Sequence, residues 1–344
     1  MFNVKDAVFQ TDALRRLALD HKDALRQLAD IEKDLRGQFA GLDDAVLALV
    51  LAVLSGEALL LVGPPGTAKS FLIREFCQRV GIDPRSSGAQ DGGYFEYLLT
   101  PFTEPGELFG FYNIQKASRD GVLERDSQGM MQHARVVYLD EVFNGSSAIL
   151  NSLLAFMNEG IFHDRGTVVP VATQCVFGAT NQMPNAPELQ AIQDRFLLRC
   201  NVQNMPARGD DLSLLFARGW RSTYGGTSNK QFPGLLDAMR TLQTDVRKLT
   251  QNNQLVPKRS SDYYLRLASV VHTCRQYGYS DMSNRRLIKL LHVMLLHAVY
   301  EAVKADDLNL ITLSNQQIQL MRFALDRWDT FIEDQLELKG DPLP

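Results

Sequence analysis

Eight consecutive residues in the first quarter of the chain have the types and spacing of a loop that binds phosphate. They follow the apolar run Leu59–Val62, and they are Gly63, Pro64, Pro65, Gly66, Thr67, Ala68, Lys69 and Ser70. Glycine lets the backbone approach phosphate oxygens closely, lysine brings a positive charge to the β and γ phosphates, and a serine hydroxyl can bind Mg²⁺. Ala68 departs from the usual pattern, which has glycine before the lysine. We predict a nucleoside triphosphate site here, the alternative being a Gly/Pro turn between a strand and a helix.

The segment that follows the loop begins with Phe71 and has a helical apolar pattern. The N-terminus of a helix at this position would present backbone N–H groups and a partial positive charge to the phosphates. Phe71 and the eight loop residues are therefore the predicted nucleotide-binding set.

Two adjacent carboxylates end a second apolar segment, Val136–Glu141. The carboxyl ends of parallel strands face the crevice in which open α/β sheets bind ligands, so these acids are expected to face the phosphate loop. We expect Asp140 to hold Mg²⁺ through its water shell and Glu141 to polarise the attacking water. A strand that ends in two acids is common by chance, but paired with the loop upstream it indicates a hydrolytic site.

A third apolar segment, Cys175–Asn181, ends in an amide. Asn181 could orient the attacking water or contact the γ phosphate. Taken alone, an asparagine at the end of a strand more often caps a turn.

Composition places the chain among ordinary globular proteins. It has 344 residues, 45% of them hydrophobic and 22% charged, which is enough for one large and one smaller domain. A formal net charge of −4 disfavours nucleic acid as the main ligand. The longest apolar run, Ala45–Leu54, is far short of the ~20 residues that a membrane span needs. Four scattered cysteines favour reduced thiols in a cytoplasm, and the histidine spacing predicts no structural zinc.

The elements that must position the site are expected in a fixed order. Within residues 1–36, apolar residues recur every three or four positions, which predicts an amphipathic helix that either forms a coiled coil or packs on its own domain. A helix is expected next, over Ala45–Leu54, and strands are expected over Leu59–Val62, Tyr94–Leu99, Val136–Glu141 and Cys175–Asn181. A second helix is expected through Ile149–Met157, capped by Ser146 or Ser147 and ended by Gly160. A hairpin is expected over Phe162–Val169, with its turn at Asp164 to Gly166.

Two regions differ from this alternation. Residues 102–133 are too long and polar for a plain connection, so we predict a projecting insert with a function, or else a solvated surface loop. Residues 204–255 are predicted as a linker and helical arm, with a polar crossing over Arg221–Lys230. Residues 256–344 are predicted as a helical lid, with helices over Asp262–Tyr277, Arg285–Val303 and Gln316–Leu336.

The order of these motifs resembles the AAA+ ATPases, and specifically their MoxR branch, with RavA-like members nearest. The stretches that carry the resemblance are Gly63–Ser70, Val136–Glu141, Phe177–Asn181, Asp194–Phe196, Glu104–Gly110, Ala148–Leu154, Asn158–Gly160 and Ser283–Arg286. Phosphate loops ending in Ala-Lys-Ser are usual in that branch. The resemblance runs from about residue 31 to about residue 330.

This resemblance implies a fold and additional site residues. The implied fold is an α/β P-loop NTPase domain with a five-stranded parallel sheet over residues 37–203, a separate all-helical lid and assembly into a ring, usually a hexamer. Arg195 matches the arginine that the family presents to the neighbouring subunit's γ phosphate, with Arg199 as the alternative. Arg285 matches the lid's sensor arginine, with Arg286 as the alternative. Residues near 102–133 and 161–169 match the insert and hairpin that mark this branch.

The expected function is Mg²⁺-dependent ATP hydrolysis by a ring-forming homo-oligomer that remodels partner proteins in a chaperone-like way. The resemblance implies a partner with a von Willebrand factor A domain. One alternative is a slow-turnover scaffold or regulatory switch that recruits partners. A DNA motor is a third possibility, and the acidic charge balance counts against it.

Overall fold

The computed structural model describes residues 8–85, 93–121, 123–164, 167–225, 230–259, 261–278, 280 and 282–325. The chain divides into two compact units. The helical unit comprises Met1–Asp30, Val53–Gly56 and Leu235–Pro344, and the sheet unit comprises Ile31–Ala52 and Glu57–Gly234. The predicted domain boundaries at residues 36, 203 and 255 do not coincide with this division, because the start of the chain and the helix after residue 235 belong with the lid residues.

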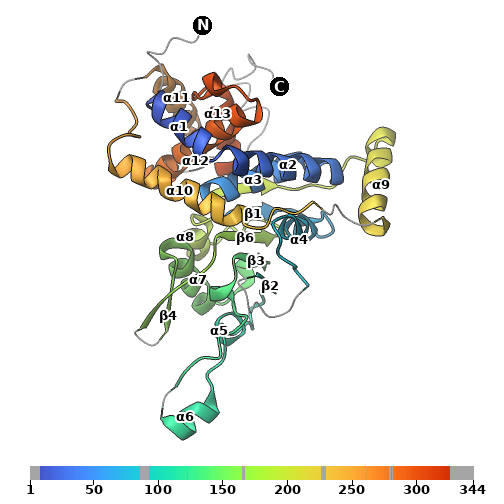
Figure 1. Ribbon diagram of the computed structural model, residues 1–344. Helices are drawn as coiled ribbons and strands as arrows, with labels where there is room; N and C mark the ends of the chain where they lie inside the picture. Colours follow the sequence, from blue (N-terminus) through green and yellow to red (C-terminus); the bar gives the residue numbers. More distant parts are fainter. Residues whose placement is uncertain are drawn as a thin grey trace. The chain divides into compact units, whose positions relative to one another are not determined.

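A five-stranded parallel sheet forms the centre of the sheet unit and confirms the predicted fold class (Figure 1). The strands lie in the order β2-β3-β6-β1-β7, and every pair is parallel. Their bounds are Leu59–Val62 (β1), Tyr94–Leu98 (β2), Val136–Asp140 (β3), Cys175–Thr180 (β6) and Leu198–Asn201 (β7). Strand β1 is buried along its whole length, as expected for a central strand covered on both faces.

Helices that begin just after two of these strands position the site. Helix α4 (Lys69–Arg79) follows β1, and α7 (Ser147–Glu159) follows β3. Ser146, not Ser147, caps α7, because its hydroxyl accepts the Ile149 N–H, and Gly160 ends the helix with φ 63°. One cluster of buried apolar side chains joins the sheet to α7 and the turns around it; it includes Leu60, Leu139, Phe143, Leu153 and Phe196.

The sheet unit also contains α3 (Asp43–Ser55, up to Ala52), α8 (Gln190–Gln193) and α9 (Gly209–Tyr224). The predicted polar crossing from Arg221 therefore begins inside a helix, and residues 226–229 lie outside the described chain. The hairpin consists of β4 (Ile161–Asp164) and β5 (Thr167–Pro170), and its predicted turn lies partly outside the described residues.

The insert is narrower than the sequence indicates. Helix α5 (Pro105–Phe109) and the 3₁₀ turn Met131–His133 bury Leu108, Phe109 and Met131 completely. Residues 110–126 run out and back between them and carry α6 (Ile114–Asp120), which lies away from the sheet (Figure 1). Three buried apolar residues among polar ones lack a clear period, so the ends of the predicted insert looked like loop although they belong to the core.

The predicted N-terminal helix is two helices, α1 (Thr11–Asp20) and α2 (Lys22–Gln38). The break is at His21, whose ring nitrogen lies 3.2 Å from a carboxylate oxygen of Asp245. The apolar positions Leu17, Leu28 and Leu35 are buried within the chain. This burial favours packing on the protein's own domains over a coiled coil.

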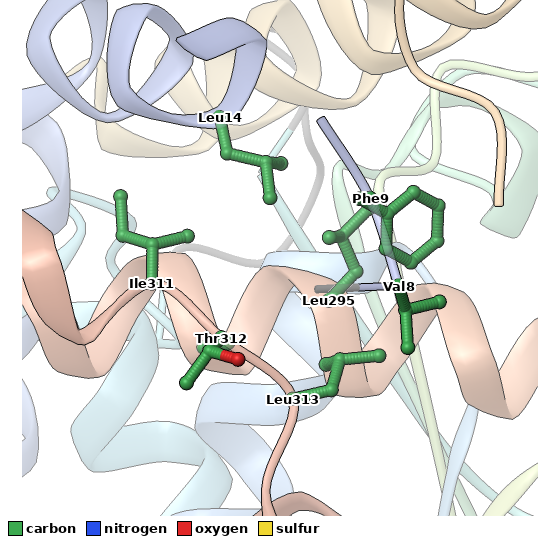
Figure 2. A pocket seen from close by; sticks show the side chains of 8 residues that line it. Val8, Phe9, Leu14, Leu295, Ile311, Thr312 and Leu313 are labelled. Atoms are coloured by element: carbon green, nitrogen blue, oxygen red, sulfur yellow. The ribbon is translucent and has the colours of Figure 1, made fainter. Parts of the chain in front are cut away.

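The helical unit consists mainly of α1, α10 (Leu235–Gln251), α11 (Asp262–Gln276), α12 (Asn284–Lys304) and α13 (Asn315–Gln319). A 3₁₀ segment, Leu320–Ala324, follows α13, and the rest of the predicted helix to Leu336 lies outside the described residues. Figure 2 shows a small apolar pocket where Val8, Phe9 and Leu14 face Leu295 of α12 and residues 311–313. None of the described helices is both long and apolar enough to cross a bilayer.

Candidate functional site

The predicted phosphate loop connects β1 to α4 at the carboxyl edge of the sheet. The Gly63 N–H donates to the Thr180 carbonyl at 3.0 Å, and the Val202 N–H donates to the Val62 carbonyl at 2.7 Å. A Cβ atom at Gly63 would lie 1.9 Å from the Val202 carbonyl oxygen. Only glycine can therefore begin the loop without moving the backbone that follows β7.

The loop turns sharply before the helix. Gly66 has φ 83°, and Ala68 is left-handed with φ 61° and ψ 23°. Ala68 is also the N-cap of α4 and makes no side-chain cap hydrogen bond, so the first N–H groups of the helix are not satisfied by its side chain. Pro64, Pro65 and Gly66 are exposed, whereas Thr67 is buried and its hydroxyl donates to the Pro64 carbonyl at 2.9 Å. The arrangement is an exposed turn at a helix N-terminus, which suits an anion.

Lys69 directs its ammonium group back into this turn. The nitrogen donates to the carbonyl oxygens of Gly63 at 2.5 Å and Pro64 at 3.0 Å, and the residue is 8% exposed. Burial lowers the pKa of Lys69, while the negative charges of Asp140 and Glu141 act in the opposite direction. The ammonium group of Lys69 therefore interacts electrostatically with both predicted acids.

The two acids stand at a sharp bend. Asp140 is the last residue of β3, and Glu141 is left-handed with φ 50° and ψ 48°. The Glu141 N–H donates to an Asp140 carboxylate oxygen at 3.1 Å. The next two residues, Val142 and Phe143, are buried. Their burial anchors the chain beyond the bend, so the half-buried carboxylates stay at the edge of the sheet.

Ser70 and Phe71 complete the predicted nucleotide-binding set in the first turn of α4. Ser70 is half-buried, and the ring of Phe71 packs edge-on against Phe39, with the ring centroids 5.3 Å apart. No group of three His, Cys, Asp or Glu side chains among the described residues could hold a metal ion. A hydroxyl and a carboxylate at one edge fit Mg²⁺, which takes oxygen ligands and usually keeps several waters while binding substrate phosphates.

Asn181 follows β6 immediately and is exposed. Gly178 of β6 pairs with Leu139 of β3, so Asn181 and Asp140 leave their strands at the same edge of the sheet. The Thr180 hydroxyl donates to the Gln182 carbonyl at 3.0 Å, which shapes the turn around Asn181.

Two arginines are candidates for the arginine finger, the residue that reaches the γ phosphate of a neighbouring subunit, and their surroundings differ. Arg199 is 5% exposed and donates to the carbonyls of Gln193 at 2.8 Å and Phe196 at 3.3 Å. Arg195 lies in the turn between α8 and β7 and is half-buried. Arg199 therefore holds this turn together, and Arg195 is the better placed of the two to reach beyond it.

The two candidate sensor arginines in the helical unit differ in the same way. Arg286 is 5% exposed and donates to the Ala324 carbonyl at 2.6 Å. Arg285 is exposed in the first turn of α12. Arg286 is a packing residue of the helical unit, which leaves Arg285 as the candidate for a ligand.

Phe196 is a positioning residue that sequence reasoning missed. Its ring packs against Phe143, with centroids 6.5 Å apart, and a Cβ at Gly178 would lie 2.8 Å from it. The turn after Glu141, the strand before Asn181 and the turn of Arg195 therefore share one buried ring. A glycine inside a strand is the signal that could have indicated this close approach.

Comparisons with known proteins show which family the chain is similar to. Residues 26–244 match the family model described as the MoxR domain in the MoxR-vWA-beta-propeller ternary systems. An uncharacterized protein of Methanocaldococcus jannaschii is 36% identical over 154 residues, which are 45% of this chain and 39% of that protein. The chaperone MoxR1 of Mycobacterium tuberculosis is 24% identical over 248 residues, which are 71% of this chain and 59% of MoxR1.

The fold also resembles a solved structure. The crystal structure of a candidate ATPase from Cytophaga hutchinsonii matches with a TM-score of 0.64 at 15% identity, over 94% of this chain and 97% of that one. At this identity the likeness shows the fold alone. The family model matches well over half of the residues of this chain. The chain belongs to the MoxR family of AAA+ ATPases.

Proposed function

We propose that this chain hydrolyses ATP with Mg²⁺ at the loop between β1 and α4. The observation that carries the proposal is that the loop after β1 and the acids at the end of β3 lie at the same edge of the parallel sheet, where the charges of Asp140 and Glu141 act on Lys69. The backbone from Gly63 to Ser70 would cradle the phosphates, and Lys69 would neutralise the β and γ oxygens. Ser70 and Asp140 would hold Mg²⁺, and it would supply charge neutralisation for the departing phosphate.

The hydrolytic step needs a polarised water. The Glu141 carboxylate would accept its proton, and the Asn181 amide would orient it. The left-handed bend at Glu141 supports this assignment, because a strained backbone at a titratable residue is a feature of functional sites.

The remaining site residues would come from outside this pocket. We propose a homo-oligomeric ring, of hexameric size in this family, in which Arg195 reaches the γ phosphate of the neighbouring subunit. The half-buried position of Arg195 in a turn, next to the fully buried Phe196, supports a presented but anchored guanidinium. Arg285 would sense the nucleotide from the lid, and its exposure supports that assignment over Arg286.

We propose that hydrolysis drives chaperone-like remodelling of a partner with a von Willebrand factor A domain. The family model is named for systems that combine these components, and one relative is named a chaperone. The proposed location is the cytoplasm, supported by four buried cysteines that form no disulfide in the described chain. The second candidate is a slow-turnover scaffold that recruits the same partner in the ATP state.

Phosphate release by the parent and by Glu141→Gln tests the proposal. We expect the variant to bind ATP and Mg²⁺ normally and to turn over about 10²- to 10⁴-fold more slowly, because the general base is lost while its shape remains. Glu159→Gln, an exposed acid at the end of α7, is the matched control. Equal turnover by Glu141→Gln and the parent would refute the assignment. If Glu141→Gln binds the partner but does not remodel it, the result favours the remodelling function. If the variant recruits the partner and acts on it as the parent does, the result favours the slow-turnover scaffold.

A further inference from the structure

The insert carries an antiparallel stem that meets the hairpin β4–β5. The stem consists of residues 110–113 and 123–126, joined by a bridge between Tyr112 and Arg125 and by hydrogen bonds from the Asn113 N–H to the Glu124 carbonyl and from the Asp126 N–H to the Phe111 carbonyl, both 2.8 Å. Gly110 begins the stem with φ 95°, and a Cβ there would lie 2.1 Å from the Asp126 carbonyl oxygen. The two stem chains are therefore in contact from their base.

Arg125 binds the hairpin with one nitrogen and its own stem with the other two. Its Nε donates to an Asp164 carboxylate oxygen at 3.0 Å, Nη1 donates to the Gly110 carbonyl at 2.7 Å, and Nη2 donates to the Tyr112 hydroxyl at 2.9 Å. The Tyr112 hydroxyl donates to the same Asp164 oxygen at 3.1 Å. The guanidinium also lies 4.1 Å from the centroid of the Tyr112 ring.

This ion pair is sheltered, unlike the ion pair between Lys116 and Glu124. The side chains of Arg125 and Asp164 are 16% and 20% exposed, whereas those of Lys116 and Glu124, 2.8 Å apart, are 50% and 58% exposed. A planar guanidinium with several partners holds its geometry better than a flexible, solvated ammonium. The Arg125 pair is therefore expected to constrain the insert, and the Lys116 pair is not.

Aromatic rings also connect the base of the insert to the hairpin and to α7. The ring of Phe109, at the base of the insert, stacks on Phe162 of β4 with centroids 4.3 Å apart and planes at 13°. Phe109 also contacts Phe156 of α7, at 6.4 Å between centroids. Helix α7 packs against β4 and begins six residues after Glu141. A continuous packed path thus runs from the acids through α7 and the hairpin to the insert.

We propose that the hairpin and the insert stem form one rigid body, that Arg125 is the positioning residue that locks it, and that this body moves as a unit when nucleotide binds. The movement rests on the proposed ATP function, but the lock does not. The consequence is that the insert tip around α6 follows the nucleotide site through the hairpin, with no contact of its own to the phosphate loop.

Distances between two spin labels test the lock in the absence of nucleotide. Labels on Ser118→Cys and Val168→Cys, both exposed positions, report the insert tip against the hairpin, and the four native cysteines are buried. Labelled protein is diluted with unlabelled protein so that only pairs within one chain are read. We expect a narrow distance distribution in the parent and in Lys116→Ala, and a broad one in Arg125→Ala and Asp164→Ala. The double variant should broaden the distribution by less than the sum of the two single variants, since both remove the shared contact between Arg125 and Asp164.

Two results would overturn the lock. One is a distribution in Arg125→Ala as narrow as in the parent, and the other is equal broadening in Lys116→Ala. If Arg125→Ala fails to fold, Tyr112→Phe removes only the bridging hydroxyl and should broaden the distribution by a smaller amount.

A second label pair, on Ser118→Cys and Asp83→Cys, reports the insert tip against the end of α4. With Glu141→Gln added and ATP and Mg²⁺ bound, this distance should shift while the Ser118 to Val168 distance stays the same. An unchanged Ser118 to Asp83 distance, or a shift in both distances, would contradict movement as one body. Calorimetry on the same protein reads ATP binding separately, so a failed proposed function shows as absent binding and leaves the lock result standing.

Discussion

The ammonium nitrogen of Lys69 lies 2.5 Å from the carbonyl oxygen of Gly63, the first residue of the same loop. The backbone of the turn therefore positions the cation. Burial lowers the pKa of Lys69, and the negative charges of Asp140 and Glu141 act to raise it. Keeping the ammonium charged in this turn therefore costs solvation free energy, which a bound triphosphate would offset.

Lys69→Ala should weaken ATP binding by about 10- to 100-fold, since one charge-assisted hydrogen bond is worth about 1.5–3 kcal/mol. Isothermal calorimetry with ATP and Mg²⁺ measures the loss. Lys33→Ala, which removes an exposed lysine of α2, is the matched control and should bind like the parent. Unchanged affinity in Lys69→Ala would show that the loop is not the phosphate site.

Arg195→Ala should lose ATP turnover, whereas Arg199→Ala should lose stability. Arg195→Ala is expected to bind ATP normally, to keep its stability and to lose about 10³-fold or more in turnover, as arginine fingers do. Arg199→Ala should lower the free energy of unfolding by about 1–3 kcal/mol, because the carbonyls of Gln193 and Phe196 lose the hydrogen bonds that the buried Arg199 guanidinium donates. Denaturant melts and phosphate release separate the two effects.

Mixing Arg195→Ala with Lys69→Ala tests whether the finger acts in trans. Some interfaces in a mixed ring would pair an intact pocket with an intact arginine, so part of the activity should return. A mixture that co-assembles, as shown by native mass spectrometry, and yet remains inactive would exclude Arg195 as a finger supplied between subunits.

Gly63→Ala should destabilise the fold and abolish nucleotide binding together. The new Cβ would lie 1.9 Å from the backbone oxygen of Val202, and strain of this kind in a packed region costs about 1–3 kcal/mol. Gly219→Ala is the control, since no atom lies within 4 Å of the added Cβ inside α9, and it should stabilise by roughly 0.5–1 kcal/mol. Thermal melts that rank the two variants in the opposite order would contradict the loop geometry.

The helical unit should lose stability in mild acid because of His292. Burial, followed by the positive charges of Arg247 and Lys289, lowers the pKa of His292 from 6.5 to about 4. Below pH 6.5 the unfolded chain binds a proton that the folded chain refuses, so stability falls as the pH drops toward 4 and the contribution levels off below it. The loss is at most about 3.5 kcal/mol, at about 1.4 kcal/mol per pKa unit.

Unfolding midpoints at pH 7 and pH 5 measure this effect. His292→Gln should reduce the difference between the two pH values, whereas His133→Gln, which changes an exposed histidine, should leave it as in the parent. An equal pH response in the parent and in His292→Gln would show that another group is responsible.

The chemistry of the site could be read from sequence because its signals are local. A glycine-rich turn between an apolar strand and a helix, and two acids at the end of a second strand, each specify a short backbone path. The parallel sheet then brings their ends to one edge, as the strand pairing of β1, β3 and β6 shows. The buried strands and the cap at Gly160 follow from the same short-range rules.

The roles of individual residues with similar sequence surroundings depended on what packs against each of them. Arg195 and Arg199, or Arg285 and Arg286, have the same side chain a few positions apart, and only the tertiary structure buries one of each pair against backbone carbonyls. The break at His21 and the core role of Phe109 are likewise set by distant partners, Asp245 and Phe162. Sequence alone predicted which groups lie at the carboxyl edge of the sheet, because local backbone geometry suffices for that. Tertiary packing decided which arginines are exposed and how the insert is held, because burial depends on the whole surrounding chain.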